Sequence, residues 1–157
     1  QATRSDWDAI RTQAAKATSI VERQLYYSAL GLAADKALAK ETMALAISGT
    51  PDATSASQMM VSVGRAHPEL AFDFVRANQA AVDKLVENAG RPRFISRLVA
   101  ASTDPEMVAK LQAYAATLPV DQAKPIVQAL TSLKQRLATR PAQRVQTTVW
   151  LERASKR

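Results

Sequence analysis

Apolar residues recur with helical spacing along almost the whole chain. Trp7, Ile10, Ala14 and Ala17 follow one another at intervals of three or four, which places them on one face of a helix. Similar stripes occupy residues 20–32, 36–46, 55–66, 68–78, 82–89, 94–99, 106–118, 121–137 and 145–150. The pattern predicts an all-α protein of about ten helices, each of about 10–16 residues, joined by short links.

Polar residues and glycines predict where several helices begin and end. Ser19 and Glu22 have the spacing of a capping box, and Asp35 is a second candidate N-cap. Gly31 and Gly90 are placed to end helices, Gly31 through a left-handed residue. Pro68 suits a first helical position, residues 91–93 predict a short break, and a proline at position 141 predicts a break before the last helix.

Short links favour helices that pair as antiparallel hairpins. Pairs of roughly 30–45 residues stacked side by side form an αα-hairpin superhelix, a HEAT-like solenoid. We therefore expect residues 1–157 to form a single helical domain of this class. The chain shows no strict sequence repeat, which keeps a globular helical bundle as the alternative.

Composition supports helices and excludes several kinds of chemistry. The 157 residues include only four glycines and 5% aromatics, whereas about one residue in five is alanine. The chain has no cysteine and one histidine, and it contains no HExxH, phosphate-loop or nucleophile-elbow motif. We therefore predict no catalytic residue and no metal ligand in this chain. No apolar run reaches the ~18 residues of a membrane span.

The chain begins with glutamine and shows no signal-like segment, which we interpret as a processed chain or a fragment. The absence of cysteine fits both the cytoplasm and the periplasm and does not choose between them.

The net charge of +7 is concentrated in the second part of the chain. Residues 1–90 contain nine basic and ten acidic residues, which leaves +8 for residues 91–157. Such asymmetry can mark a surface for nucleic acids or acidic ligands, or a basic face that is simply solvated. The basic residues are not interleaved with exposed aromatics, so we do not expect nucleic-acid binding.

Several stretches, in order, resemble the gluzincin zinc aminopeptidases of the puromycin-sensitive, endoplasmic-reticulum and membrane alanyl type. Residues 71–79 (AFDFVRANQ) are similar to that family's A-W-x-F-x-x-x-N-W, with Phe72 and Gln79 where tryptophan is usual. Residues 90–99 are similar to its G…F-x-x-x-R-L-I, and residues 146–153 (QTTVWLER) to its closing N-x-x-W-L. Residues 19–31 resemble its R…L-x-A-L-G hairpin.

The resemblance implies the later part of the C-terminal helical domain of such an enzyme. In that family the domain is built of HEAT-like hairpins, encloses the active-site chamber and limits which peptides enter. Zinc and its HExxH helix belong to an earlier, catalytic domain. The resemblance thus implies no cofactor in this chain, the catalytic domain of the same polypeptide as partner, and peptides as substrates. An uncovered solenoid end would also allow self-association.

Arg97 is the candidate that we single out for peptide binding. It coincides with the family's arginine and lies among apolar residues on a helix, where a guanidinium needs a partner. That partner is either an acidic side chain of the domain or the carboxylate or backbone of a peptide. Arg93 and Arg91 flank the same segment and extend a positive rim, or are solvated loop charges.

Other conspicuous residues have structural interpretations. We expect Trp7 to anchor a hairpin, Met59 and Met60 to fill the core, His67 to cap a helix or face solvent, and Asn78 to bond within its hairpin.

Two functions follow. The first is the non-catalytic domain of a zinc aminopeptidase, inactive by itself. The second is a stand-alone helical-repeat scaffold that binds a protein or a polyanion.

Overall fold

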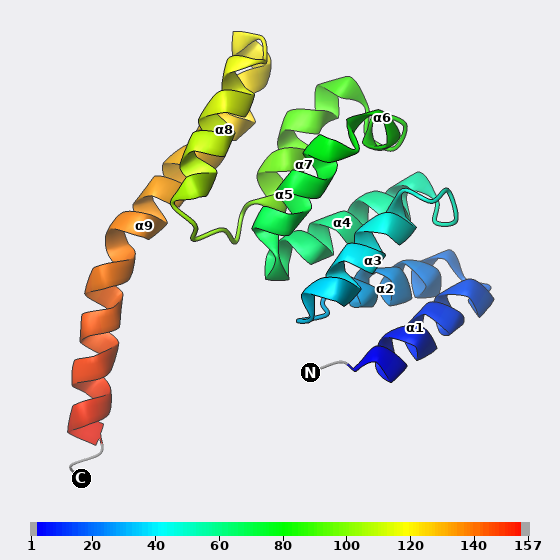
Figure 1. The fold of residues 1–157 in the computed structure, drawn as a ribbon, viewed down its shortest axis with the longest axis horizontal. Helices are drawn as coiled ribbons and strands as arrows, with labels where there is room; N and C mark the ends of the chain where they lie inside the picture. Colours follow the sequence, from blue (N-terminus) through cyan, green and yellow to red (C-terminus); the bar gives the residue numbers. More distant parts are fainter. Residues whose placement is uncertain (1–2, 155–157) are drawn as a thin grey trace. The chain divides into compact units, whose positions relative to one another are not determined.

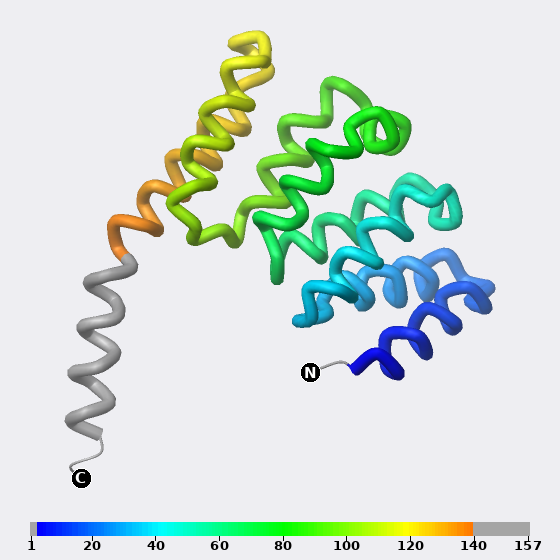
Figure 2. Tube along the Cα trace, in the orientation of Figure 1, coloured from blue at the N-terminus to red at the C-terminus, as the bar shows by residue number. Residues whose placement is uncertain are grey.

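The computed structural model describes the backbone of residues 3–154 and the side chains of residues 3–139 (Figures 1 and 2). All regular structure in this part of the chain is helical, which confirms the predicted fold class. The elements are α1 (Arg4–Lys16), α2 (Ile20–Leu30), α3 (Lys36–Ala46), α4 (Ala53–Ala66), α5 (Pro68–Ala77), α6 (Gln79–Val82), the 3₁₀ helix η1 (Asn88–Gly90), α7 (Arg91–Leu98), α8 (Glu106–Ala116) and α9 (Val120–Ala154).

The chain divides into two compact units, Gln1–Ser102 and Thr103–Arg157. The first unit is a two-layered stack of hairpins. One layer consists of α2, α4 and α7, in which α4 packs on both of the others, and the other layer contains α1, α3 and α5 (Figure 1). Because α4 contacts α2, α3, α5 and α7, the core of this unit lies around α4.

The core side of α4 is fully enclosed. Met59, Met60 and Val63 are each 0% exposed, as expected for apolar residues that recur on one helical face. The two methionines therefore fill the core, as predicted. Their flexible thioether side chains suit the irregular space between helices of two layers.

Close helix packing explains two glycines. Gly31 has a φ of −71°, so the predicted left-handed stop is wrong. A Cβ on Gly31 would instead lie 2.8 Å from the backbone oxygen of Met59, and one on Gly64 would lie 2.8 Å from the Cα of Leu98. Glycine at these positions lets α2 and α7 approach the backbone of α4.

A buried hydrogen-bond cluster joins the first three helices. Trp7 is 2% exposed, and its Nε1 donates to Oγ1 of Thr42 at 3.0 Å. The Thr42 hydroxyl also lies 3.2 Å from the backbone oxygen of Leu30 and 2.9 Å from that of Leu38. Trp7 is thus a hairpin anchor, as predicted, and the cluster fixes α1 and α2 to α3.

The helix starts agree with the sequence in part. The Asp35 carboxylate accepts from the backbone amides of Ala37 and Leu38, so the predicted cap of α3 is confirmed. The predicted Ser19–Glu22 capping box is wrong, because the Ser19 side chain makes no capping bond and Glu22 accepts from the Tyr26 hydroxyl. A capping box forms at α1 instead, between residues 3 and 6.

Three predicted boundaries are corrected. The helix expected over 82–89 is replaced by α6, turns and η1, because Asp83 turns back to an ion pair with Arg91. Residues 91–93 form the first turn of α7. Proline fits there because the first backbone N–H groups of a helix have no hydrogen-bond partner within the helix. The break expected at position 141 is wrong, because α9 runs on from Val120 to Ala154 and the proline lies within it, at the loss of one backbone hydrogen bond.

The second unit is a helical hairpin of α8 and α9. Met107, Leu111 and Tyr114 of α8 are buried, as are Ile126 and Leu133 of α9. The side chains from position 140 onward, including those of the motif at 146–153, lie outside the described residues. Within the described part of the chain, none of the helices combines the length and apolar character needed to cross a membrane.

Candidate functional site

The α2–α4–α7 layer carries a concentration of positive charge. Helix α4 contains Arg65 and helix α7 contains Arg91, Arg93 and Arg97, and neither helix has an acidic residue. Guanidinium groups remain charged at any physiological pH. The free surface of α4 and α7 therefore attracts anions.

Arg97 and Arg65 lie beside the same small cleft. The cleft has a volume of about 350 Å³ and is lined by Val61, Arg65, Arg97, Ala100 and Ala101. Both arginines are exposed, while Val61 at the floor is 4% exposed. Two guanidinium groups beside an apolar floor suit a carboxylate that is attached to an apolar side chain.

Arg97 has an amide partner. Its Nη2 donates to Oε1 of Gln58 on α4 at 3.3 Å. From the sequence, an acidic side chain of the domain was one of the possible partners of Arg97. The side chain that accepts its hydrogen bond is instead the neutral amide of Gln58. The positive charge of Arg97 thus stays available to a ligand, while the hydrogen bond orients the guanidinium along α4.

The other two candidate arginines behave differently. Arg93 is exposed on the first turn of α7. Arg91 is held by the preceding segment, with Nη2 2.6 Å from Oδ1 of Asp83 and a hydrogen bond to Asn88. The side chain of Arg91 is only 16% exposed, so it serves packing and does not join Arg97 at the cleft.

Arg65 was not among the sequence candidates. Its signal was weak, because it is a single charge at the end of an otherwise uncharged helix. It lies seven residues after Gln58, and that spacing places both residues on one face of α4. The pairing of α4 with α7, which brings Arg65 and Arg97 to one cleft, was not visible in the sequence.

Helix α2 adds an exposed apolar stripe to the same layer. Val21 and Leu25, four residues apart on α2, are 76% and 67% exposed, and Leu32, in the turn after the helix, is 57% exposed. This stripe lies opposite Tyr27 and Leu30, which are buried. Apolar side chains gathered on one free helix face are typical of surfaces that contact another protein segment.

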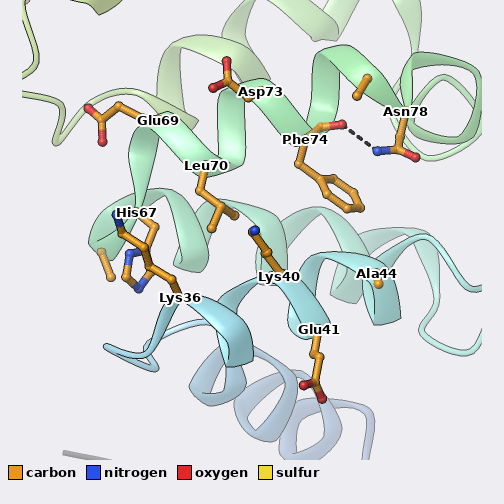
Figure 3. A pocket seen from close by; sticks show the side chains of 12 residues that line it. Lys36, Lys40, Glu41, Ala44, His67, Glu69, Leu70, Asp73, Phe74 and Asn78 are labelled. Atoms are coloured by element: carbon orange, nitrogen blue, oxygen red, sulfur yellow. Dashed lines mark hydrogen bonds between the residues drawn. The ribbon is translucent and has the colours of Figure 1, made fainter.

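A larger groove lies in the other layer, between α3 and α5 (Figure 3). It has a volume of about 950 Å³. Leu70, Phe74 and three alanines form its apolar part, and charged residues stand on both sides: two lysines and a glutamate on α3, and a glutamate and an aspartate on α5. The lining residues are Lys36, Lys40, Glu41, Ala44, Ala66, His67, Glu69, Leu70, Asp73, Phe74, Ala77 and Asn78.

Several polar residues around this groove are held within the fold. Arg4 Nη1 donates to Oε2 of Glu41 at 2.7 Å and lowers the pKa of the Glu41 carboxyl, which points away from the groove (Figure 3). Ser102 donates to Glu69 at 2.6 Å. Asn78 Nδ2 donates to the backbone oxygen of Phe74 at 2.9 Å, as predicted for a bond within its hairpin.

The described residues do not fit a zinc site. The half-buried ring of His67 lies between α4 and α5, and its Nε2 is 2.9 Å from the backbone oxygen of Ala33. Among the residues that the structure describes, no group of three histidine, aspartate or glutamate side chains is placed to hold a metal ion. We therefore derive no reaction step for this chain through a metal.

Comparison with known proteins gives a single family. A family model described as the ERAP1-like C-terminal domain matches residues 1–135. Neither the curated proteins nor the solved structures provide a match. The match covers most of the chain and agrees with its stacked helical hairpins, as expected for the C-terminal helical domain of ERAP1-type aminopeptidases. The chain belongs to the ERAP1-like C-terminal domain family.

Proposed function

We propose that this chain is a non-catalytic wall of a zinc aminopeptidase, which encloses the active-site chamber and shapes the access of peptide substrates. Membership in the ERAP1-like C-terminal domain family is the observation that carries the proposal. In this proposal the catalytic domain of the same polypeptide holds the zinc. The described part of this chain supplies surface and charge to the chamber.

The surface of the α2–α4–α7 layer supports a role in peptide contact. Arg97 and Arg65 beside the apolar floor of Val61 provide a place for an anionic group, and a peptide substrate carries one at its C-terminal carboxylate. The exposed stripe around Val21 and Leu25 provides apolar contact for side chains. We assign the cleft beside Arg97 to the substrate carboxylate, with Arg93 contributing long-range attraction.

A binding measurement on the 157-residue chain tests the carboxylate assignment. The probes are a labelled peptide with a free C-terminus and the same peptide with a C-terminal amide. We expect the carboxylate peptide to bind more tightly, and the double substitution Arg65→Met and Arg97→Met to abolish the difference. Lys84→Met, which removes an exposed charge elsewhere, is the matched control. Equal affinity for both peptides would overturn the assignment.

The coding sequence upstream of Gln1 tests the parent enzyme. An HExxH motif followed by a downstream glutamate supports the proposal, because these residues bind zinc and activate water. Absence of such a signature, or hydrolysis of aminoacyl substrates by the purified chain alone, would refute it. A steeply salt-dependent affinity for DNA or RNA would favour the scaffold alternative.

A further inference from the structure

The arginine cleft and the exposed apolar stripe of α2 lie close together in one layer of the first unit. Gly31, which follows α2, meets the middle of α4, where a Cβ on it would lie 2.6 Å from the Cβ of Ser62 and 2.9 Å from the backbone nitrogen of Val63. Ser62 follows Val61, which lines the cleft together with the two arginines. Leu32, the residue after Gly31, therefore lies beside the cleft, on the side of α4 that is opposite α7.

Helix geometry gives the distances along this surface. The close contact at Gly31 brings the axes of α2 and α4 to about 8 Å, the lower end of the usual range, so Leu32 lies about one such spacing from the cleft. Leu25 lies seven residues before Leu32, which is about 10 Å along α2. Measured across α4 and then along α2, the direct path from the cleft to Leu25 is about 13 Å.

An extended peptide matches these two distances at alternate residues. It advances about 3.4 Å per residue and places every second side chain on the same face. If its last residue lies in the cleft, the second residue before the last lies about 7 Å away and the fourth about 14 Å away, and both side chains face the same surface. The first distance agrees with Leu32 and the second with Leu25.

The charges of this surface favour a ligand that has a carboxylate at the cleft end. Among the residues that the structure describes, no carboxylate lines the cleft and neither Arg65 nor Arg97 forms an ion pair. Glu22, the acidic residue of α2, lies in the first turn of that helix, at the end away from the cleft, and accepts from the Tyr26 hydroxyl at 3.2 Å. Gln58 accepts from Arg97 and also carries an NH₂ group, which can donate to a peptide carbonyl but has no acceptor on an alkyl chain.

We infer that this surface selects peptides with apolar residues at the second and fourth positions before the carboxyl-terminal residue. The terminal carboxylate binds Arg65 and Arg97, the side chain at the second position packs on Leu32, and the side chain at the fourth position packs on Leu25. The inference rests on the proposed peptide contact and adds to it the positions of the apolar residues in the substrate. In a peptide of the same composition with apolar residues at the first and third positions, those side chains face solvent.

The test uses two labelled peptides of about nine residues, each with two leucines among serines and threonines and with the same carboxyl-terminal threonine. In the first peptide the leucines occupy the second and fourth positions before the last residue, and in the second peptide they occupy the first and third. Fluorescence anisotropy with the 157-residue chain should show at least about fivefold tighter binding of the first peptide. Equal affinity of the two peptides would overturn the inference.

The amidated forms of both peptides separate this failure from a failure of the proposed function. A preference for the free carboxylate without a preference between the two leucine patterns would overturn the inference and leave the carboxylate assignment in place. Equal affinity of the free and amidated forms would refute the carboxylate assignment, and with it the inference, because the positions are counted from the bound carboxylate. The absence of binding by any of the four peptides would refute both.

Substitution of the two leucines of the chain locates the contact. Leu25→Ser with Leu32→Ser should abolish the preference for the first peptide and retain the preference for a free carboxylate. The two side chains are 67% and 57% exposed, so their loss should leave the fold intact, which circular dichroism checks. Val120→Ser with Val127→Ser removes two exposed apolar side chains of α9 and is the matched control. A preference that survives in the leucine variant, or that is lost equally in the control, would contradict the contact.

Two other occupants of this surface would give different results. Dodecanoate that binds the chain and is lost in the leucine variant, without binding of either peptide, would assign the surface to small anionic amphiphiles. A dimer in sedimentation that the leucine variant dissolves would assign the stripe to a second copy of this chain. Either outcome would overturn the inference.

Discussion

Gly64 of α4 faces the backbone of Leu98 on α7 with no room for a side chain. A Cβ on Gly64 would lie 2.8 Å from the Cα of Leu98 and 3.0 Å from its carbonyl carbon. These neighbours are backbone atoms, which cannot rotate away as the end of a flexible side chain can. The spacing between α4 and α7, and with it the arginine cleft, therefore depends on this glycine.

Gly64→Ala should destabilise the protein although it improves helix propensity. Alanine is favoured over glycine within a helix by about 1 kcal/mol, whereas overpacking against a fixed backbone costs about 1–3 kcal/mol or more. We expect a net loss of up to about 2 kcal/mol in urea denaturation. Gly90→Ala is the control, because its nearest neighbour would be a Val86 methyl at 3.9 Å. A more stable Gly64→Ala protein would contradict the tight α4–α7 contact.

Thr42→Val should disconnect the first hairpin from α3. The substitution keeps the shape of the side chain but leaves the buried N–H of Trp7 without its acceptor. An unsatisfied buried donor costs about 1–3 kcal/mol, so we expect a loss of that size in the free energy of unfolding. Thr12→Val removes an exposed hydroxyl that bonds only to its own helix and should change stability by less than about 0.5 kcal/mol.

The Asp52 cap should make stability depend on pH in the acid range. Its carboxylate accepts from the Ser55 hydroxyl at 2.6 Å and from the Ser55 amide at 2.9 Å, and these bonds lower the pKa of Asp52. Since the folded-state pKa lies below the unfolded one, this stabilisation is complete above the ordinary pKa of about 3.9 and is lost as the pH falls through the folded value.

Asp52→Asn provides the measurement. Asparagine retains a capping oxygen but does not titrate, so the variant should lose less stability than the parent protein when thermal unfolding is followed from neutral pH to below about pH 4. Asp8→Asn, at an exposed position on α1, is the matched control. If the stability of the parent protein and that of Asp52→Asn fell equally between neutral pH and about pH 4, the Asp52 cap would be excluded as a cause of the pH dependence.

The sequence predicted features that depend on neighbours along the chain and missed those that depend on pairing of distant helices. The apolar stripes, the Asp35 cap and the core position of Met59 follow from local spacing. The role of Gly31 did not, because a glycine at a helix end fits a turn as well as a close helix contact. Only the approach of α2 to α4 distinguishes these two roles.

The same difference explains the candidate site. Arg97 was found because it lies on an apolar helix, but its neighbour Arg65 is 32 positions earlier and has no local signal. Arg91 was a candidate because it flanks the segment of Arg97 in the sequence. Its ion pair with Asp83 depends on how residues 79–90 turn back, and the predicted continuous helix would not have allowed it.

Arg91 and Arg97 should therefore separate into a structural and a ligand-binding residue. Arg91→Met leaves Asp83 without its partner at a site where the arginine is 16% and the aspartate 36% exposed, and we expect a loss of about 1–2 kcal/mol in urea denaturation. Arg97→Met removes an exposed bond to neutral Gln58 and should change stability by less than about 0.5 kcal/mol. In the binding assay with the carboxylate peptide, Arg97→Met should have the larger effect, because Arg97 lines the cleft and Arg91 does not. Equal effects of both variants on stability and on peptide affinity would contradict this division.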